Sequence, residues 1–263
     1  MCCRYWADES PKLRAIVEEM NRSVLVPKWQ KTTAIKTYGE IRPTDVVPVI
    51  APDRSGSRAV FPMKWGFTGR SLLVNARSET AGTKPTFRES WECRRCIVPA
   101  SWYFEWEHLR ENDDRTRTGE DIEAEPLSDP DPSNARPDNF SGRSPDLTRH
   151  FAAEPLSERD PSSVRPNKLG GRSPDLTRKF KIWPKSSDMT WLCGLYRIEE
   201  GLPVFTVLTR EPGEEIRFIH NRMPLILPEK YIDDWIRPET KPEELLGEAL
   251  TDMAFEAVVE KQA

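Results

Sequence analysis

Apolar residues recur at helical spacing near the start of the chain, over residues 13–20. Ser10 and Pro11 precede them, and a serine N-cap followed by proline at the first helical position is a common helix start. In the last third of the chain, residues 228–236 and 242–250 each begin with proline and carry apolar residues spaced by three or four. The pattern predicts an amphipathic helix near the start and a more helical C-terminal third.

Short apolar segments bounded by Pro and Gly predict strands over much of the remaining chain. The eight segments are residues 46–51, 58–67, 71–77, 95–100, 102–107, 179–183, 189–198 and 202–210. So many strands with few helices favour an α+β domain, built on a curved or barrel-like mixed β-sheet with flanking helices.

A tandem duplication interrupts this pattern. Residues 124–151 recur at 153–180 with a period of 29, and 19 of 28 positions are identical. The two copies hold nine of the chain's 24 prolines and show no helical or strand period, which favours a disordered or loosely extended insert. Long surface insertions cost little closure entropy, about 0.6 kcal/mol for each doubling of length. We expect the insert, 124–180, to loop out of a folded domain.

Without the insert the chain keeps 206 of its 263 residues, a normal size for one domain. We expect a single domain over residues 1–263, with its core at 1–110 and 179–250. An apolar content of 37% and a charged content of 31% are typical of a soluble globular protein. Since neither a long apolar run nor a secretory signal is present, we expect a protein of the cytoplasm with no membrane contact. We also expect a monomer, although the sequence leaves the oligomeric state open.

The net charge of −4 provides no general attraction to nucleic acid, so any DNA contact must come from a local basic cluster. Five cysteines are an odd number for a disulfide framework, and we expect reduced thiols. Cys93 and Cys96 form a single C-x-x-C pair, whereas structural zinc sites have two such pairs or a histidine pair. We expect no metal and no cofactor, with Cys96 in a buried strand and Cys193 in the core.

Cys2 would become the N-terminal residue if Met1 were removed. It would then carry a primary amine and a thiol on adjacent carbons, a pair that reacts with aldehydes. The amine has a reference pKa of about 7.7–8.0, so part of it is neutral and can form a Schiff base. The thiol can then close a five-membered thiazolidine ring, and Arg4 could raise the thiolate fraction. Cys2 alone does not separate this chemistry from an incidental cysteine.

Five sequence blocks occur in order along the chain: MCCRY at the start, YGEIRPT at 38–44, MKWGFTGRSLLVNARSET at 63–80, RCIVPASWYFEW at 95–106 and IHNRMPL at 219–225. Together they resemble the SRAP (SOS-response-associated peptidase) family, also called abasic-site processing proteins. The resemblance covers nearly all of residues 1–108 and 179–236 and leaves the insert outside it. It implies a single SRAP domain that holds abasic single-stranded DNA in a groove, links it covalently to Cys2 and protects it during the DNA damage response.

The resemblance also implies roles for single residues. Asn75 matches the position that orients the N-terminal amine. Glu105 matches a catalytic carboxylate that exchanges a proton with the amine, for which it must titrate near neutrality. His220 matches a catalytic histidine that can protonate the sugar ring oxygen as the aldehyde opens. The catalytic set implied by the resemblance is therefore Cys2, Asn75, Glu105 and His220.

The resemblance further implies a DNA-binding set. Arg77 and Arg222 match phosphate-contacting arginines, and Arg4 adds a third contact. Trp65 and Trp106 match aromatic positions near the DNA groove, where a base can stack on a ring.

Each of these residues also has a structural interpretation. The alternatives are a solvent-facing strand position for Glu105, a loop position for His220, surface ion pairs for Arg77 and Arg222, a turn for Asn75 and core packing for Trp65 and Trp106.

The chain departs from the family pattern at Cys3, where Gly is usual. A second thiol could oxidise with Cys2 or compete for the aldehyde. FTGR after Gly66 and the Ser101-Trp102 pair are further departures, and they could change the affinity for DNA.

Three functions compete at this stage. The first is covalent capture of abasic sites in single-stranded DNA, with lyase-like cross-linking and self-removal of Met1. The second is a thiol peptidase acting on other proteins, with Cys2 as nucleophile and His220 as base. The third is a noncovalent single-stranded DNA-binding protein, whose binding salt would reverse. A DNA-binding role implies association with the nucleoid and with replication or repair partners that the sequence does not identify.

Overall fold

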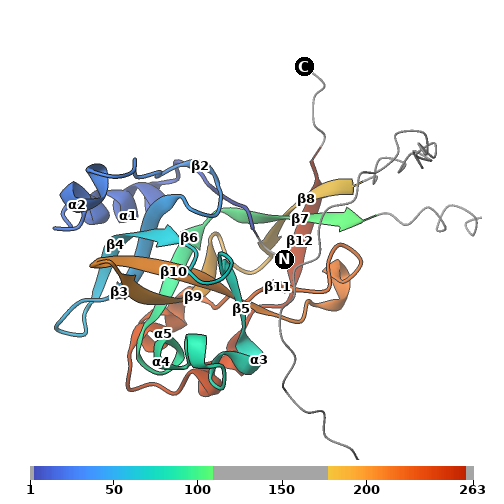
Figure 1. Cartoon of the computed structure of the whole chain (residues 1–263). Coiled ribbons are helices and arrows are strands. Elements are labelled where there is room, and N and C mark those ends of the chain that lie inside the picture. The colour runs from blue at the N-terminus through green and yellow to red at the C-terminus, as the bar shows by residue number, and fades with distance from the viewer. Residues whose placement is uncertain (1–2, 109–176, 259–263) are drawn as a thin grey trace, which may run out of the picture. The chain divides into compact units, whose positions relative to one another are not determined.

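Two β-sheets form the framework of the computed structural model, which describes residues 3–108 and 177–258 (Figure 1). The first sheet has five antiparallel strands. In order across the sheet they are β12 (Met253–Ala257), β8 (Thr177–Pro184), β7 (Trp102–His108), β1 (Tyr5–Ala7) and β2 (Gly39–Ile41). The strand β7 therefore lies between β1, from the start of the chain, and β8, which follows the insert.

The second sheet has seven strands and closes on itself. Its main path is β11 (Met223–Pro224), β10 (Leu202–Arg210), β4 (Arg58–Trp65), β3 (Val46–Pro52), β6 (Arg95–Ala100) and β9 (Thr190–Glu199), while β5 (Asn75–Arg77) pairs with β10. Because β9 pairs with β10 as well as with β6, the strands β10, β4, β3, β6 and β9 form a closed ring. This ring confirms the predicted α+β fold with a barrel-like mixed sheet.

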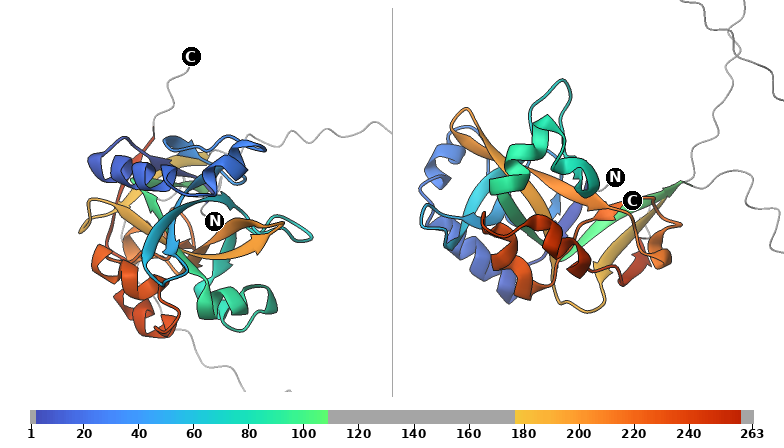
Figure 2. Two further views of the ribbon diagram at one scale, coloured as in Figure 1. Left: turned by 90° about the vertical axis from the view of Figure 1, so that its left-hand side faces the viewer. Right: turned by 90° about the horizontal axis from the view of Figure 1, so that it is seen from below.

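Helices cover two opposite sides of the sheets. The helices α1 (Pro11–Asn21) and α2 (Val26–Gln30) lie on one side, and α3 (Ser78–Ala81), α4 (Pro85–Cys93) and α5 (Ile232–Ile236) lie on the other (Figures 1 and 2). Short 3-10 helices occur at η2 (Glu214–Ile216), η3 (Glu229–Tyr231) and η4 (Pro242–Glu248). In the described part of the chain, no helix is long and apolar enough to cross a membrane.

The helix predicted near the start is α1. Ser10 caps it, since its side chain accepts a hydrogen bond from the Leu13 backbone N–H, and Pro11 opens the first turn. Its four predicted apolar positions are all buried: Leu13, Ile16, Val17 and Met20. In the C-terminal third, residues 228–236 form η3 and α5, whereas 242–250 form the 3-10 helix η4 rather than an α-helix.

Most of the predicted strands are present, and two of them, 95–100 and 202–210, have the predicted bounds as β6 and β10. Residues 71–77 form a strand only over Asn75–Arg77. The boundary of the insert also needs correction, because residues 177–180 open β8 and pair with β7. The rest of the insert lies outside the described residues.

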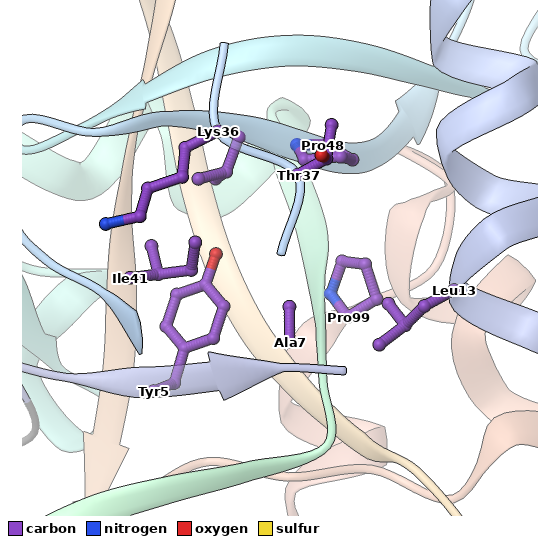
Figure 3. A pocket seen from close by; sticks show the side chains of 9 residues that line it. Tyr5, Ala7, Leu13, Lys36, Thr37, Ile41, Pro48 and Pro99 are labelled. Carbon is purple, nitrogen blue, oxygen red and sulfur yellow. The ribbon is translucent and has the colours of Figure 1, made fainter. Parts of the chain in front are cut away.

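The strand β1 is held on both edges and from the interior. Tyr5 pairs with Ile41 of β2 and with Tyr103 of β7, and its side chain is only 1% exposed. Tyr5 and Ala7 lie around a cavity of about 10 Å³ together with Pro99 (Figure 3). This volume holds about one water molecule, so the cavity is a packing gap rather than a substrate site.

The cysteines of the two sheets follow the prediction. Cys96 in β6 and Cys193 in β9 are fully buried, and burial raises the pKa of both thiols. Cys93 ends α4, is exposed and donates to the Glu89 carbonyl at 3.1 Å. A buried thiol with a raised pKa has little thiolate, so Cys96 and Cys193 act as small core residues.

Candidate functional site

Glu105 is a buried carboxyl group in the middle of β7. Its exposure is 3%, and it lies opposite Phe180 of β8. Burial raises the pKa of Glu105 to about 7, although the positive charge at the N-terminus of the chain acts in the opposite direction. Glu105 is therefore not the solvent-facing strand residue of the structural interpretation. It is a group that can gain or lose a proton near neutral pH.

The chain before β1 runs alongside Glu105. Tyr5 pairs with Tyr103, and the Phe104 backbone N–H donates to the Arg4 carbonyl at 2.9 Å. Continuing this antiparallel register by one residue brings Cys3 opposite Glu105. Burial raises the pKa of the Cys3 thiol, and the negative charge of Glu105 raises it further, which agrees with that register. Cys2 lies outside the described residues but is joined directly to Cys3.

Asn75 and Arg77 lie on β5, a short strand held parallel to β10. Asn75 pairs with Val207 and Arg77 with Thr209. The indole N–H of Trp65 donates to the Val74 carbonyl at 2.9 Å, which fixes the chain just before Asn75. Asn75 is half-buried and Arg77 is exposed.

Arg222 holds the loop after η2 against the start of α3. Its guanidinium donates from Nη1 and Nη2 to the two carboxylate oxygens of Glu79, each at 2.8 Å, and from Nη2 to the Thr209 carbonyl at 2.6 Å. Burial would raise the pKa of Glu79, but the bonds from Arg222 outweigh it and lower that pKa. The Arg222 side chain is only 13% exposed. Arg222 thus forms the ion pair of the structural interpretation and positions its own loop.

His220 lies in that same loop and is half-buried. Its Nδ1 accepts from the Arg222 backbone N–H at 2.9 Å and lies 3.2 Å from the Arg222 carbonyl oxygen. The neutral ring accepts at Nδ1 from the Arg222 N–H. A ring protonated at Nδ1 would instead donate to the Arg222 carbonyl and lose the bond from the N–H. The bond from the Arg222 N–H therefore orients the neutral ring with its proton on Nε2, the nitrogen that points away from this loop backbone contact.

An open pocket of about 400 Å³ lies between β5 and this loop. Three arginines line it together with Asn221, Glu211 and Pro212; the arginines are Arg77, Arg217 and Arg222. Such a concentration of guanidinium groups suits a phosphate. Sequence reasoning missed Arg217 and Glu79, although Arg217 lies three residues before His220 in the same stretch of sequence.

An aromatic contact joins the Glu105 strand to the His220 loop. Phe180 pairs with Glu105, and its ring meets that of Phe218 edge-on, with ring centroids 5.8 Å apart. Phe218 is 51% exposed and lies two residues before His220. The fold thus brings Glu105, Cys3 and the loop that carries His220 toward one region, and β5 reaches the same loop through Glu79 and Arg222.

The two tryptophans proposed to contact DNA have different surroundings. Trp65 is 0% exposed and packs between Tyr5 and Phe205. It has no ring face open to a base, so we assign it to the core and do not carry it into the DNA contacts. Trp106 is half-buried, and the Arg4 guanidinium lies 5.2 Å from its ring centroid.

A family model matches most of the chain. The family model described as SOS response associated peptidase (SRAP) matches residues 1–121 and 171–261. The chain belongs to the SRAP family. The match leaves out 122–170, which is most of the duplicated insert, so the SRAP residues of this chain are the two segments that flank it.

Curated relatives and solved structures extend the SRAP comparison. The chain is 23% identical over 244 residues to abasic site processing protein YoqW of Bacillus subtilis, covering 88% of this chain and 79% of that protein. It is 26% identical over 179 residues to abasic site processing protein YoaM of the same organism, covering 66% and 51%. A crystal structure of a protein from Bacteroides thetaiotaomicron has a TM-score of 0.59 at 17% identity, covering 98% of this chain and 93% of that one. A phage-related protein from Bordetella bronchiseptica gives 0.58 at 16% identity, covering 98% and 94%. The two structures share the fold.

Proposed function

We propose that this chain captures abasic sites in single-stranded DNA by forming a thiazolidine with Cys2 after removal of Met1. The observation that carries the proposal is a buried carboxyl group, Glu105, beside Cys3, the residue joined to Cys2. Relatives named abasic site processing proteins support the choice of substrate. An abasic deoxyribose exposes an aldehyde when its ring opens, and an N-terminal cysteine is well suited to bind one.

The first stage forms an imine. The Glu105 carboxylate accepts a proton from the Cys2 ammonium, and the free amine attacks the aldehyde carbon. Glu105 then returns the proton to the hydroxyl of the adduct, which leaves as water. A carboxyl group whose pKa is about 7 is populated in both forms at neutral pH, so it can carry out both transfers. Asn75 orients the amine in this proposal.

The second stage closes the ring. The Cys2 sulfur adds to the imine carbon, and the thiol proton passes to the nitrogen. The sum is one aldehyde and one aminothiol giving one thiazolidine and one water, with no oxidant or reductant. Because both the amine and the thiol of Cys2 are consumed, a chain that retains Met1 cannot form this product.

His220 and the arginine pocket serve the DNA. His220 protonates the deoxyribose ring oxygen as the sugar opens, and the Arg222 backbone orients it. Arg77 and Arg217 contact phosphates at the mouth of the pocket, where both are exposed. Arg222 contributes by holding the loop, since Glu79 already occupies its guanidinium.

The test is intact-mass and denaturing-gel analysis after mixing the protein with single-stranded DNA that contains one abasic site. We expect an adduct that survives denaturation, with the mass of protein plus DNA minus one water. It should be absent in Cys2→Ala and in protein that retains Met1. Cys3→Ser is the matched control, because it removes the neighbouring thiol and keeps the aminothiol. No adduct from chain that starts at Cys2 would overturn the proposal.

Two readouts separate the competing functions, namely salt-reversible DNA binding and cleavage of other proteins. Binding that salt reverses, with no adduct, identifies a noncovalent DNA-binding protein. Cleavage of other proteins by chain that retains Met1 identifies a thiol peptidase, because that reaction needs only the thiol.

The duplicated insert is proposed to be dispensable for capture. A deletion of residues 124–180 would also remove Phe180, which lies opposite Glu105 in β8. A deletion of residues 124–174 spares the whole strand and is the correct variant. We expect it to form the adduct at the rate of the full chain, whereas a folded deletion variant with no adduct would contradict this view.

A further inference from the structure

One face of the five-stranded sheet interleaves aromatic rings with cations. Residues directly opposite each other in antiparallel strands share a face, and here Phe104 lies opposite Lys181 and Trp106 opposite Lys179. Because side chains alternate between the two faces of a sheet along each strand, Trp102 and Trp183 lie on this same face, and the pairing of β1 with β7 adds Trp6 and Arg4. We call this set the Trp–Lys face; it consists of Arg4, Trp6, Trp102, Phe104, Trp106, Lys179, Lys181 and Trp183.

Each lysine of the Trp–Lys face lies between two aromatic side chains. The Lys181 Nζ is 3.9 Å from the Trp102 ring centroid and 5.0 Å from that of Trp183. The Lys179 Nζ is 4.3 Å from the Phe104 centroid and 5.5 Å from that of Trp106. These contacts hold the cations against flat apolar surfaces.

A stacked pair extends the face onto the next strand. The rings of Trp6 and Trp102 lie 5.8 Å apart with an interplanar angle of 3°. Both are half-buried, as are Trp106 and Trp183. The face therefore has apolar surface from β1 across β7 to β8, strands that lie side by side in Figure 1.

The Trp–Lys face carries an excess of positive charge. Glu40 of β2 accepts hydrogen bonds from Arg4 at 2.8 Å, Arg42 at 2.9 Å and Lys179 at 3.3 Å. One carboxylate thus meets three cations. Within the described residues Lys181 has no ion-pair partner, although Glu256 of β12 lies opposite it in the sheet, so the cations of the face still outnumber its carboxylates. A polyanion would complement this distribution.

We propose that the Trp–Lys face binds the single strand of DNA that flanks the captured site, with bases stacked on its rings and phosphates held by Lys181. This inference rests on the proposed function. Basic groups along a groove with interleaved aromatic rings are the recurring means of binding single strands without reading sequence. Trp106 follows Glu105 along β7 and Arg4 follows Cys3, so the face lies on the opposite side of the sheet from the Glu105 side chain, and the strand would reach it around the end of β1.

The extent of the face sets the length of DNA involved. From Trp106 to Trp102 the strand spans about 13 Å at about 3.3 Å per residue. A stacked strand advances about 3.4 Å per nucleotide, so this distance accommodates about four nucleotides. Affinity should therefore rise with the length of the flanking strand and then level off.

The experiment compares two oligothymidylates that carry a tetrahydrofuran analogue of the abasic site, which has no aldehyde and cannot cross-link. One has a single nucleotide on each side of the analogue and the other has six. We expect the wild type to bind the long oligonucleotide more tightly by fluorescence anisotropy. Lys181→Ala should weaken binding of the long one about fivefold or more. It should also reduce the salt slope by about 0.7.

Two further variants serve as controls. Lys181→Arg keeps the charge and the contact with the rings, and should bind as the wild type does. Lys185→Ala removes an exposed lysine that follows the end of β8 and is paired with Glu215 and Asp252, and it should change nothing. Loss of affinity in Lys181→Ala alone therefore reports on the face and not on total charge.

Equal affinity for both oligonucleotides in the wild type would overturn the proposal, as would an unchanged affinity in Lys181→Ala. Competition by poly-glutamate at the same charge concentration as the DNA would also overturn it, in favour of an acidic protein partner. Cross-linking of the long oligonucleotide with a true abasic site is measured separately in the wild type. Failure there, with length-dependent binding retained, overturns capture by Cys2 and leaves the face as a DNA-binding surface.

Discussion

Arg95 and Glu105 lie on consecutive strands and are both buried, with exposures of 0% and 3%. Among the described residues they are the only charged side chains in the core. The Arg95 guanidinium donates to five backbone carbonyls, which belong to Trp91, Glu92, Trp235, Arg237 and Thr240. Glu105 has a pKa near 7 and lies beside the N-terminal segment.

The difference shows how the surroundings of a buried charge determine its role. Arg95 joins the ends of α4 and α5, so its charge is used to satisfy carbonyl groups that the helices leave open. Glu105 lies where burial makes its charged and neutral forms nearly equal in free energy at neutral pH. We infer that Arg95 stabilises the fold and that Glu105 performs chemistry.

The largest expected effect is on the rate of capture by Glu105→Gln. The amide is close in shape but can neither take up nor return a proton. General acid–base catalysis contributes about 10²- to 10⁴-fold, and we expect a loss of rate in that range. The check is single-turnover cross-linking followed on denaturing gels. A variant that reacts at the wild-type rate would show that Glu105 is not the proton carrier.

Arg95→Leu should have the next largest effect, on stability. It leaves five carbonyls without their donor, and removing one partner of a buried charged network costs about 3–5 kcal/mol. Urea unfolding should show this loss, whereas Lys185→Ala should unfold as the wild type does. If the variant is as stable as the wild type, Arg95 does not hold the helix ends. At low temperature the remaining folded variant should still form the adduct.

Glu105 should also give stability a pH dependence that Arg95 does not. Its pKa is raised from 4.5 to about 7 in the folded chain, so the protonated form is favoured by folding. Its contribution is complete below about pH 4.5 and is lost as pH rises through about 7, a change of about 3.5 kcal/mol at ~1.4 kcal/mol per pH unit. Glu105→Gln should therefore exceed the wild type in Tm at pH 8 and match it near pH 4.5. Parallel Tm profiles would contradict the raised pKa.

The smallest expected effect concerns the Arg222–Glu79 pair, a partly exposed counterpart of the Arg95 network. Glu79 is 46% exposed, and pairs of this kind contribute about 1 kcal/mol or less. Glu79→Gln should lower the cross-linking rate about fivefold or less, because the His220 loop is held less firmly. Glu89→Gln, which breaks the exposed pair with Arg94, is the matched control. A pH–rate profile that moves in Glu79→Gln alone would show that the pair acts through His220.

Regular patterns allowed much of the sheet framework to be predicted. The segments that became β6 and β10 are mostly apolar over six and nine residues and have clear ends, although β6 begins at Arg95 and β10 ends at Arg210. By contrast, β1 and β2 have three residues each, too short for alternation to be recognised. The helix α4 was not predicted although Pro85 opens it, because Phe87 and Trp91 are its only large apolar residues and two positions define a helical period weakly.

The candidate site could be predicted only in part. Glu105 was identified through the family resemblance, and its burial then follows from the aromatic residues around it in β7 and β8. The pairing of Glu79 with Arg222 joins residues 143 positions apart and has no local signal. Lys179 and Lys181 alternate along β8, a pattern visible in the sequence, but their aromatic partners lie on the neighbouring strand. Contacts that depend on strand order cannot be read from one segment.

The last ladder pair of β7 and β8 gives the chain a practical use. His108 and Thr177 lie opposite each other, so the chain leaves and re-enters the sheet at points about 5 Å apart. A duplication of 29 residues between these points is compatible with an intact sheet on either side. The junction is therefore a suitable insertion site, at which a folded reporter domain whose own termini lie close together can replace residues 124–174. Such a chimera would carry its label to whatever strand Cys2 holds.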